Sequence, residues 1–312
     1  MAPSVLKTAI DTYPHTRALK DGTVTPAGFT LDHVEVSPII AAFRRMIRTM
    51  EFDISEMAIS TYLCARAHDK PITAIPVFPL RSFQHGAILY NTKSGISGPA
   101  DLAGRKVGVR AYTVTGGLWV RGILKTEYGV DLDSVTWVIV DDEHVLEYQP
   151  PPNVVRAEAG KDLAGMLVAG EIDAAIGAGR VDSPDVKPLI PDAQAAAVAF
   201  FKKTGVYPIN HTVVVKSEHL AADPGIATEL FDAFKRAKQA AVDRLGSGGE
   251  LAPEDQALAR TRDLLGTDPI PYGIAANRTT LETVVRFNVE QRIIPRAVSV
   301  EEMFASNTVG LD

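Results

Sequence analysis

A guanidinium and an imidazole lie close together in the sequence, at Arg81 and His85, between two stretches with the composition of β-strands. Arginine presents a planar fork of donors that fits a carboxylate, and histidine is the side chain best able to move a proton near neutral pH. Pro79 favours an irregular backbone at this point. A plain surface loop is less attractive, because it would expose Phe78 and Phe83 to water. The pair therefore predicts carboxylate binding and acid–base chemistry.

A carboxylate at Glu56 lies at or just past the end of a predicted strand, and Ser60 or Thr61 follows where the N-cap of a helix is expected. Open α/β sheets bind ligands at the carboxyl ends of their strands, so this place suits a functional carboxylate. The alternative is a structural carboxylate paired with a nearby arginine, and the sequence does not choose between the two.

A second histidine, His211, opens a very apolar strand predicted at residues 211–216. A lone histidine at the start of a strand is more often a satisfied structural residue than a catalyst. It becomes a candidate because this strand and the segment 85–90 are predicted to be the two crossings between two lobes, which would bring His85 and His211 to one cleft. Of the remaining histidines only His15, near the end of the first predicted strand, stays a candidate.

An anion-binding turn is predicted between a strand that ends near Arg110 and a helix that begins near Thr115. Unpaired backbone N–H groups at the helix start and the hydroxyls of Thr113 and Thr115 converge there. The glycine spacing fits neither a Walker loop nor a dinucleotide-binding turn. An ordinary capped helix explains the same residues, and on spacing alone it is the simpler interpretation.

The composition is that of a globular protein of 312 residues, with 46% hydrophobic and 22% charged residues. Its 32 basic and 38 acidic residues give a net charge of −6, which offers no attractive field to nucleic acid or anionic lipid. The single cysteine, Cys64, excludes an internal disulfide and any zinc site with two or more thiolates. No run approaches the ~20 apolar residues that span a membrane, and no secretory leader is seen, so a cytoplasmic location is expected.

Short β-rich runs alternate with amphipathic helical stretches, which predicts an α/β fold with largely parallel sheets covered on both faces. The polar, proline-broken stretch 141–160 is predicted to be an exposed loop. Strands are predicted at residues 4–10, 30–36, 53–58, 72–77, 86–91, 106–110, 135–140, 172–177 and 211–216.

Two helices have clear sequence boundaries. One is predicted over residues 38–50, and another begins at Asp223-Pro224 and ends at Gly246. No change of composition marks a linker between consecutive domains, which suggests that one domain is inserted into the other.

Taken together, these segments resemble the 4,5-dihydroxyphthalate decarboxylase family, whose fold is that of the type 2 periplasmic solute-binding proteins. The matching stretches follow the family's order over most of the chain: Asp53-Ile-Ser-Glu-Met57, Ala74-Ile-Pro-Val-Phe-Pro79 with Arg81 and His85, Val107-Gly-Val109 with Tyr112, Thr115 and Trp119-Val-Arg-Gly-Ile-Leu124, Thr204-Gly205-Val-Tyr-Pro208 with His211, and Tyr272-Gly273 with Asn277-Arg278-Thr-Thr-Leu-Glu282. Ala111 and Asn210 depart from the acidic and apolar residues usual at these positions, next to the pocket, which leaves the exact substrate open.

The resemblance implies an α/β protein with a two-lobed type 2 periplasmic-binding-protein-like fold and two crossover strands. Residues 1–90 and 211–312 would form a discontinuous first lobe, residues 91–210 an inserted second lobe, and the ligand cleft would lie between them. It also implies a carboxy-lyase of phthalate degradation that converts 4,5-dihydroxyphthalate to protocatechuate. No cofactor or metal is expected, and the expected partner is a small aromatic carboxylate.

Roles for individual residues follow from the resemblance and from the chemistry of decarboxylation. Arg81 is expected to bind the carboxylates, and His85 and His211 to act as acid and base in either order. Glu56 is expected to orient a histidine or to act as an alternative base. The expected contacts with the substrate come from Ser60, Tyr112, Thr113, Thr115, Trp119, Arg180 and Asn210.

Other interpretations stay open on sequence alone. One is a binding protein that delivers an aromatic or dicarboxylic anion to a transporter, and another is an enzyme of pyrimidine or cofactor biosynthesis built on the same fold, which would not require the Arg81 and His85 pair. A metal held by His85, His211 and Glu56 is the alternative to the metal-free site, although no local metal-binding motif is present. Whether the chain forms a homo-oligomer is also open.

Overall fold

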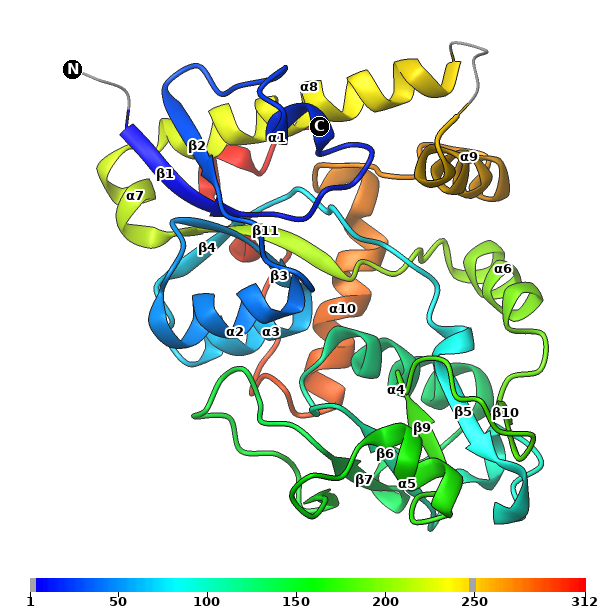
Figure 1. Cartoon of the computed structure of the whole chain (residues 1–312). Coiled ribbons are helices and arrows are strands. Elements are labelled where there is room, and N and C mark those ends of the chain that lie inside the picture. The colour runs from blue at the N-terminus through cyan, green and yellow to red at the C-terminus, as the bar shows by residue number, and fades with distance from the viewer. Residues whose placement is uncertain (1–3, 247–250) are drawn as a thin grey trace. The chain divides into compact units, whose positions relative to one another are not determined.

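The chain is divided between two units, whose backbone Figure 1 shows. The computed structural model describes residues 4–246 and 251–312. Unit 1 comprises Met1–Arg81, Ile209–Glu282 and Val298–Asp312, and unit 2 comprises Ser82–Pro208 and Thr283–Ala297. Each unit has its own β-sheet.

The sheet of unit 1 has the strand order β2-β1-β3-β11-β4. Its first three strands are parallel to one another, and β11 runs antiparallel to both of its neighbours. The β-branched run of β11 is fully buried, as expected for a central strand. The strands are β1 (Ser4–Ala9), β2 (Phe29–His33), β3 (Ile54–Ala58), β4 (Ile72–Ile75) and β11 (His211–Lys216).

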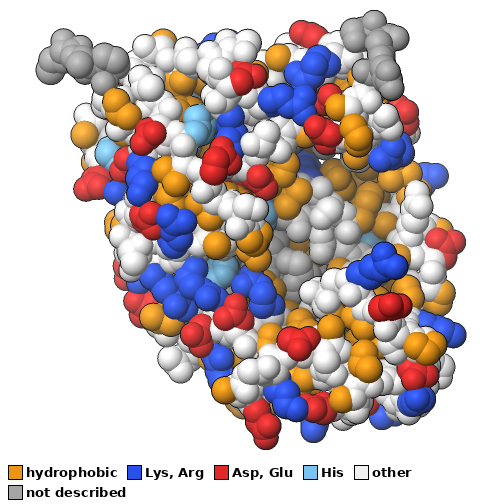
Figure 2. Space-filling view, in the orientation of Figure 1, with side chains coloured by type: hydrophobic (Ala, Val, Ile, Leu, Met, Phe, Trp, Pro, Cys, Tyr) orange, Lys and Arg blue, Asp and Glu red, His pale blue; other side chains and the backbone are white. Residues whose placement is uncertain are grey.

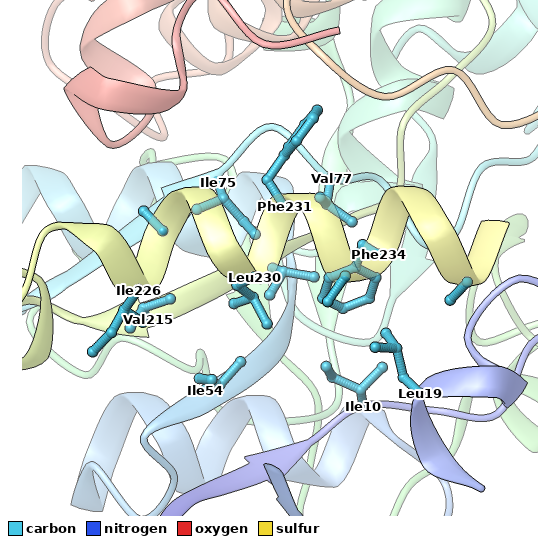
Figure 3. Packing of buried hydrophobic residues seen from close by; sticks show 14 of the residues in the cluster. Ile10, Leu19, Ile54, Ile75, Val77, Val215, Ile226, Leu230, Phe231 and Phe234 are labelled. Atoms are coloured by element: carbon cyan, nitrogen blue, oxygen red, sulfur yellow. The ribbon is translucent and has the colours of Figure 1, made fainter. Parts of the chain in front are cut away.

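Helices cover both faces of this sheet, with α8 on one face and α2 and α3 on the other (Figure 1). Figure 3 shows Leu230 and Phe234 of α8 packed toward Ile54 and Ile75 of the strands, in the main apolar cluster of the unit. Basic side chains gather over α2 on the visible surface (Figure 2). The helices are α1 (Arg17–Lys20), α2 (Ile40–Thr49), α3 (Ile59–Ala67), α7 (Ser217–Ala222), α8 (Gly225–Gly246) and α9 (Pro253–Leu265), and α10 (Arg278–Glu290) contributes residues to both units.

The sheet of unit 2 has the order β10-β5-β9-β6-β7-β8. Strands β6 to β9 are parallel, whereas β5 runs antiparallel to β9 and to β10. The strands are β5 (Ile88–Asn91), β6 (Lys106–Val109), β7 (Thr136–Ile139), β8 (Val154–Arg156), β9 (Ala174–Ile176) and β10 (Val186–Pro188), and the helices are α4 (Thr115–Tyr128), α5 (Leu163–Ala169) and α6 (Ala193–Thr204).

All nine predicted strands are present, and the helices predicted at 38–50 and 223–246 correspond to α2 and α8. Strands β8 and β10 were not predicted. Each is three residues long at an edge of its sheet, and β8 lies inside the stretch predicted to be a loop. The sheets are mixed rather than largely parallel, because β11 and β5 run against their neighbours.

The unit boundaries differ from the predicted lobe boundaries in three places. Residues 209 and 210 group with unit 1. Residues 82–90 group with unit 2, because β5 pairs with β9 and β10 there. Residues 283–297 also group with unit 2, because Phe287 packs edge-on against Trp119, with ring centroids 5.6 Å apart. Among the described residues, no helix has the length and apolar character needed to cross a membrane.

Candidate active site

The pairing of β3 with β11 brings Glu56 and His211 together in unit 1. Val213 lies directly opposite Glu56, and Ala58 lies opposite His211. Since side chains two residues apart on a strand share a face, His211 is the diagonal neighbour of Glu56 on the same face of the sheet. The Nδ1 atom of His211 lies 2.5 Å from Oε1 of Glu56.

Glu56 is a fully buried carboxylate with three donors around it. Oε1 also accepts a hydrogen bond from the Tyr13 hydroxyl at 2.7 Å, and Oε2 accepts one from the backbone N–H of Asp11 at 3.1 Å. Burial raises the pKa of Glu56, but the hydrogen bonds from His211, Tyr13 and Asp11 outweigh it, and the pKa lies below its usual range. The carboxylate is therefore ionised at neutral pH.

The ionised carboxylate determines how the imidazole of His211 is protonated. Because Glu56 can only accept, Nδ1 of His211 carries the proton of this hydrogen bond. Nε2 is left to take up or deliver a proton, and it makes no hydrogen bond to any residue that the structure describes. Phe43 meets the ring edge-on, with centroids 4.9 Å apart. A buried carboxylate, an oriented imidazole and a nitrogen left for proton transfer are the parts of a general acid–base dyad.

His15, in the segment after β1, is a second buried histidine in unit 1. Its Nε2 donates to the carbonyl of Pro79 at 3.0 Å, because a carbonyl only accepts. Its ring is stacked on Tyr13, with centroids 5.4 Å apart, and meets Tyr272 edge-on. Burial lowers the pKa of His15 to about 4, so this imidazole is neutral at neutral pH.

Arg81 is held next to His211 by the backbone. Arg81 forms an antiparallel bridge with Ile209, and the Leu80 carbonyl accepts hydrogen bonds from the N–H groups of Asn210 and His211. The Arg81 side chain is half-buried, and Nη1 donates to an amide oxygen of Asn277 at 2.6 Å. A guanidinium and an acid–base dyad are thus anchored on the same part of unit 1.

His85 lies in unit 2, in a single 3-10 turn before β5, and is 2% exposed. The ring of Phe200 lies 5.4 Å from it and that of Phe83 lies 6.4 Å from it, centroid to centroid. Neither ring nitrogen has a hydrogen-bond partner among the described residues. Burial lowers the pKa of His85, which favours the neutral form. Unlike His211, it has no carboxylate partner in the described part of the chain.

The predicted anion-binding turn of unit 2 holds a carboxylate of the chain itself. The backbone N–H groups of Tyr112 and Thr113 donate to Glu143 at 2.5 and 3.1 Å, and the Thr113 hydroxyl donates to it at 2.5 Å. The turn therefore does bind an anion, but its donors bind Glu143 rather than an open subsite. Thr115 begins α4 beside it and is 3% exposed.

Tyr112 and Trp119, predicted to contact the substrate, are buried in unit 2. The guanidinium of the fully buried Arg121 lies 4.0 Å from the centre of the Tyr112 ring, and Trp119 packs against Phe287. The side chain of Trp119 points from α4 into the core of unit 2, and its contact with the substrate stays a prediction. Arg180, by contrast, is exposed after β9.

Two local expectations near Glu56 are wrong. Glu56 lies inside β3 rather than at or just past its end. Its side-chain partners are His211 and Tyr13, so the structure does not show the arginine pairing that the sequence left open. Ser60 and Thr61 do not cap α3, because the helix begins at Ile59 and both residues are buried within it. Asn210 is half-buried, and its backbone carbonyl accepts from the N–H of Ile59.

The roles of Tyr13 and Glu143 were not predicted from the sequence. The signal for Tyr13 was its position just after a strand predicted to end at the ligand edge of the sheet, whereas Glu143 lies in a stretch that was assigned to an exposed loop. Within residues 4–246 and 251–312, no group of three or more His, Cys, Asp or Glu side chains is arranged to hold a metal ion.

Comparison of the sequence with known proteins identifies related proteins. Residues 45–149 match the family described as NMT1/THI5 like. The chain is 32% identical over 327 residues to the 4,5-dihydroxyphthalate decarboxylase of Comamonas testosteroni, with 97% of each protein covered. It is 34% identical over 217 residues to the protein of the same name from Pseudomonas putida, covering 63% of this chain and 81% of that protein.

The fold has a solved counterpart in the periplasmic aliphatic sulphonate binding protein SsuA from Escherichia coli. That structure matches 99% of both chains at 13% identity, with a TM-score of 0.54. The chain therefore has a periplasmic-binding-protein-like fold, and this likeness concerns the fold alone.

Proposed function

Because the chain belongs to the 4,5-dihydroxyphthalate decarboxylase family, we propose that it is a carboxy-lyase that releases CO2 from a hydroxylated phthalate. The reaction to test first converts 4,5-dihydroxyphthalate to protocatechuate. The observation that carries the proposal in this chain is the buried hydrogen bond between Glu56 and His211, because it provides a proton carrier of the kind that the reaction needs.

Loss of CO2 from an aromatic ring is difficult, because the departing electron pair lies in the ring plane and is not delocalised. Protonation of the carboxylate-bearing carbon removes this obstacle. In 4,5-dihydroxyphthalate each carboxylate is para to a hydroxyl, whose deprotonation pushes electrons to that carbon. The carbon takes a proton from an acid, the bond to the carboxylate breaks, and its electrons restore the aromatic ring. Overall one proton is consumed and one CO2 is released.

The dyad of Glu56 and His211 suits the proton-transfer steps. The carboxylate accepts the hydrogen bond of Nδ1, which orients the imidazole of His211 and leaves Nε2 as the atom that exchanges the proton. Burial lowers the pKa of His15 and of His85, and neither imidazole is hydrogen-bonded to a carboxylate of the described residues. His85 remains the candidate for the second acid–base group, and Arg81 is proposed to bind a substrate carboxylate through its planar donor fork.

The test is CO2 release and protocatechuate formation by purified protein supplied with 4,5-dihydroxyphthalate. We expect His211→Gln to lower kcat by about 100-fold or more, in the range of lost general acid–base catalysis. His219→Gln is the matched control, because His219 of α7 also bonds a carboxylate at 2.9 Å, that of Asp53, which directly precedes β3. The control should keep wild-type activity. Equal rates for wild type and His211→Gln would refute the assignment.

A solute-binding role is the second candidate, and the fold it shares with SsuA favours it. A binding protein would retain 4,5-dihydroxyphthalate without changing it. Titration calorimetry that detects binding, together with no CO2 from the same sample over many equivalents of substrate, would establish this role instead of decarboxylation.

A further inference from the structure

Asn277 is a buried amide in unit 1 whose hydrogen bonds converge on Arg81. It is 2% exposed and lies at the end of a 3-10 turn just before α10. Its Oδ1 accepts a hydrogen bond from Nη1 of Arg81 at 2.6 Å. Its Nδ2 donates to the carbonyl oxygens of Pro271 and Gly273 at 2.9 and 2.8 Å.

These bonds leave only one orientation for the amide. The two carbonyl oxygens can only accept, so the NH2 group must face them, and the oxygen must then face the guanidinium, which can only donate. An exchange of the amide oxygen and nitrogen would place donor against donor and acceptor against acceptor. The oxygen that receives Arg81 is therefore fixed by its contacts with the backbone.

The backbone around the amide is itself held in place. Gly273 has a φ of +81°, and its N–H donates to the carbonyl of Pro76 at 2.9 Å. A Cβ added to Gly273 would lie 2.5 Å from the Leu311 carbonyl oxygen, so this turn accepts only glycine. The turn that receives the amide hydrogens is thus rigid.

We propose that Asn277 is a positioning residue that sets the plane of the Arg81 guanidinium for two-point binding of a substrate carboxylate. This inference rests on the proposed function, in which Arg81 binds that carboxylate. A guanidinium binds a carboxylate through two parallel N–H bonds only when its plane faces the anion, and long side chains otherwise sample many rotamers. Asn277 therefore pre-organises the guanidinium of Arg81. The hydrogen bonds of the neighbouring Leu80 carbonyl hold the backbone of Arg81 beside His211.

The expected signature is weaker substrate binding with little change in turnover, since Asn277 touches neither the ring nor the dyad. We expect Asn277→Ala to raise KM for 4,5-dihydroxyphthalate about tenfold, which corresponds to one lost hydrogen bond of a charged group. The change in kcat should stay below about threefold. The Kd of phthalate, a dicarboxylate without hydroxyl groups, should rise by the same factor in calorimetry.

A double-mutant cycle separates positioning from a general structural effect. In Arg81→Ala, the added Asn277→Ala change should no longer alter the phthalate Kd, because the guanidinium through which Asn277 acts has been removed. Asn153→Ala is the matched control, since Asn153 also donates Nδ2 to two backbone carbonyls, those of Leu132 and Val135, in unit 2. It should lower Tm without changing Kd. The same rise in Kd with and without Arg81 would overturn the inference.

A variant at Arg81 keeps the inference testable even when Asn277→Ala does not fold. Arg81→Lys retains the charge but removes the planar fork, so we expect the phthalate Kd to rise about as much as in Asn277→Ala. An unchanged Kd in Arg81→Lys would overturn the role of the guanidinium plane. An unchanged Kd in Arg81→Ala would instead refute the proposed contact between Arg81 and the carboxylate. Absence of CO2 from the wild type would refute the proposed reaction. In that case the phthalate titration still tests the role of Asn277.

Discussion

Replacement of Glu56 by glutamine removes the negative charge from the dyad and changes the shape of the side chain little. The amide has one acceptor, whereas the carboxylate oxygens accept from Tyr13, Asp11 and His211. In either orientation the NH2 group faces at least one N–H or O–H donor. The variant therefore loses the charged acceptor that holds Nδ1 of His211, and it also acquires a buried conflict between donors.

The size of both effects can be estimated from the observed contacts. A hydrogen bond to a charged group contributes about 1.5–3 kcal/mol, so the loss of the one at 2.5 Å between Glu56 and His211 should lower kcat by ~10- to 150-fold. The donor conflict should reduce the free energy of unfolding by about 1–3 kcal/mol. Because the pKa of Glu56 lies below its usual range, the loss of kcat should be similar at every pH above about 6.

The assay is CO2 release at saturating 4,5-dihydroxyphthalate, at a temperature well below the midpoint of thermal unfolding of the variant. Glu51→Gln provides the matched control, since Glu51 is another carboxylate of unit 1 and pairs with Lys7 and Arg45. It should leave kcat unchanged. A folded Glu56→Gln protein with kcat within about threefold of wild type would refute the argument that the carboxylate supports proton transfer by His211.

Two further predictions concern stability. The pKa of His15 is lowered from 6.5 to about 4 by burial, so the unfolded chain binds more protons in this window and stability falls as the pH drops from about 6.5 to about 4. Between about pH 7 and 4.5, the wild type should lose about 2 kcal/mol more than His15→Gln, measured by urea unfolding, and equal losses would contradict burial as the cause. A Cβ on Gly122 would lie 2.1 Å from the Phe287 ring, so Gly122→Ala should cost about 1–3 kcal/mol in the same assay. Gly28→Ala, where no heavy atom lies within 4 Å of the added Cβ, should stay within about 0.5 kcal/mol of wild type, and a similar cost in both variants would argue against overpacking.

The elements could be predicted from the sequence because their patterns are local. The valines of β11 and the apolar stripe of α8 are buried in the structure as their spacing indicates. Strands β8 and β10 were not predicted, because three residues are too few to show an alternation of apolar and polar side chains. Pairing with a neighbouring strand, rather than composition, makes them strands. The grouping of residues 283–297 with unit 2 depends on long-range contacts such as that of Phe287 with Trp119, which no local pattern encodes.

The candidate site was predictable as a set of residue types but not as a set of partners. Glu56 and His211 were identified separately, and the structure joins them across 155 positions of the sequence. For the turn before α4 the sequence left two interpretations open, an anion-binding turn and an ordinary capped helix. In the structure its backbone donors bind the carboxylate of Glu143, since buried N–H groups can be satisfied by any carboxylate that the fold brings near. Partner identity is a property of the three-dimensional fold.

The register of β11 against β3 illustrates the same point in physical terms. A slip of one residue would turn His211 to the other face of the sheet, where Glu56 is out of reach. A slip of two residues would keep the face and would place Val215 where Val213 lies, or Val213 where Val215 lies. Hydrophobic burial alone thus discriminates weakly between these registers, whereas separation of a buried carboxylate from its imidazole partner would leave a charge uncompensated. The hydrogen bond between His211 and Glu56 therefore favours the register of β11 against β3, and that register in turn brings the two side chains together.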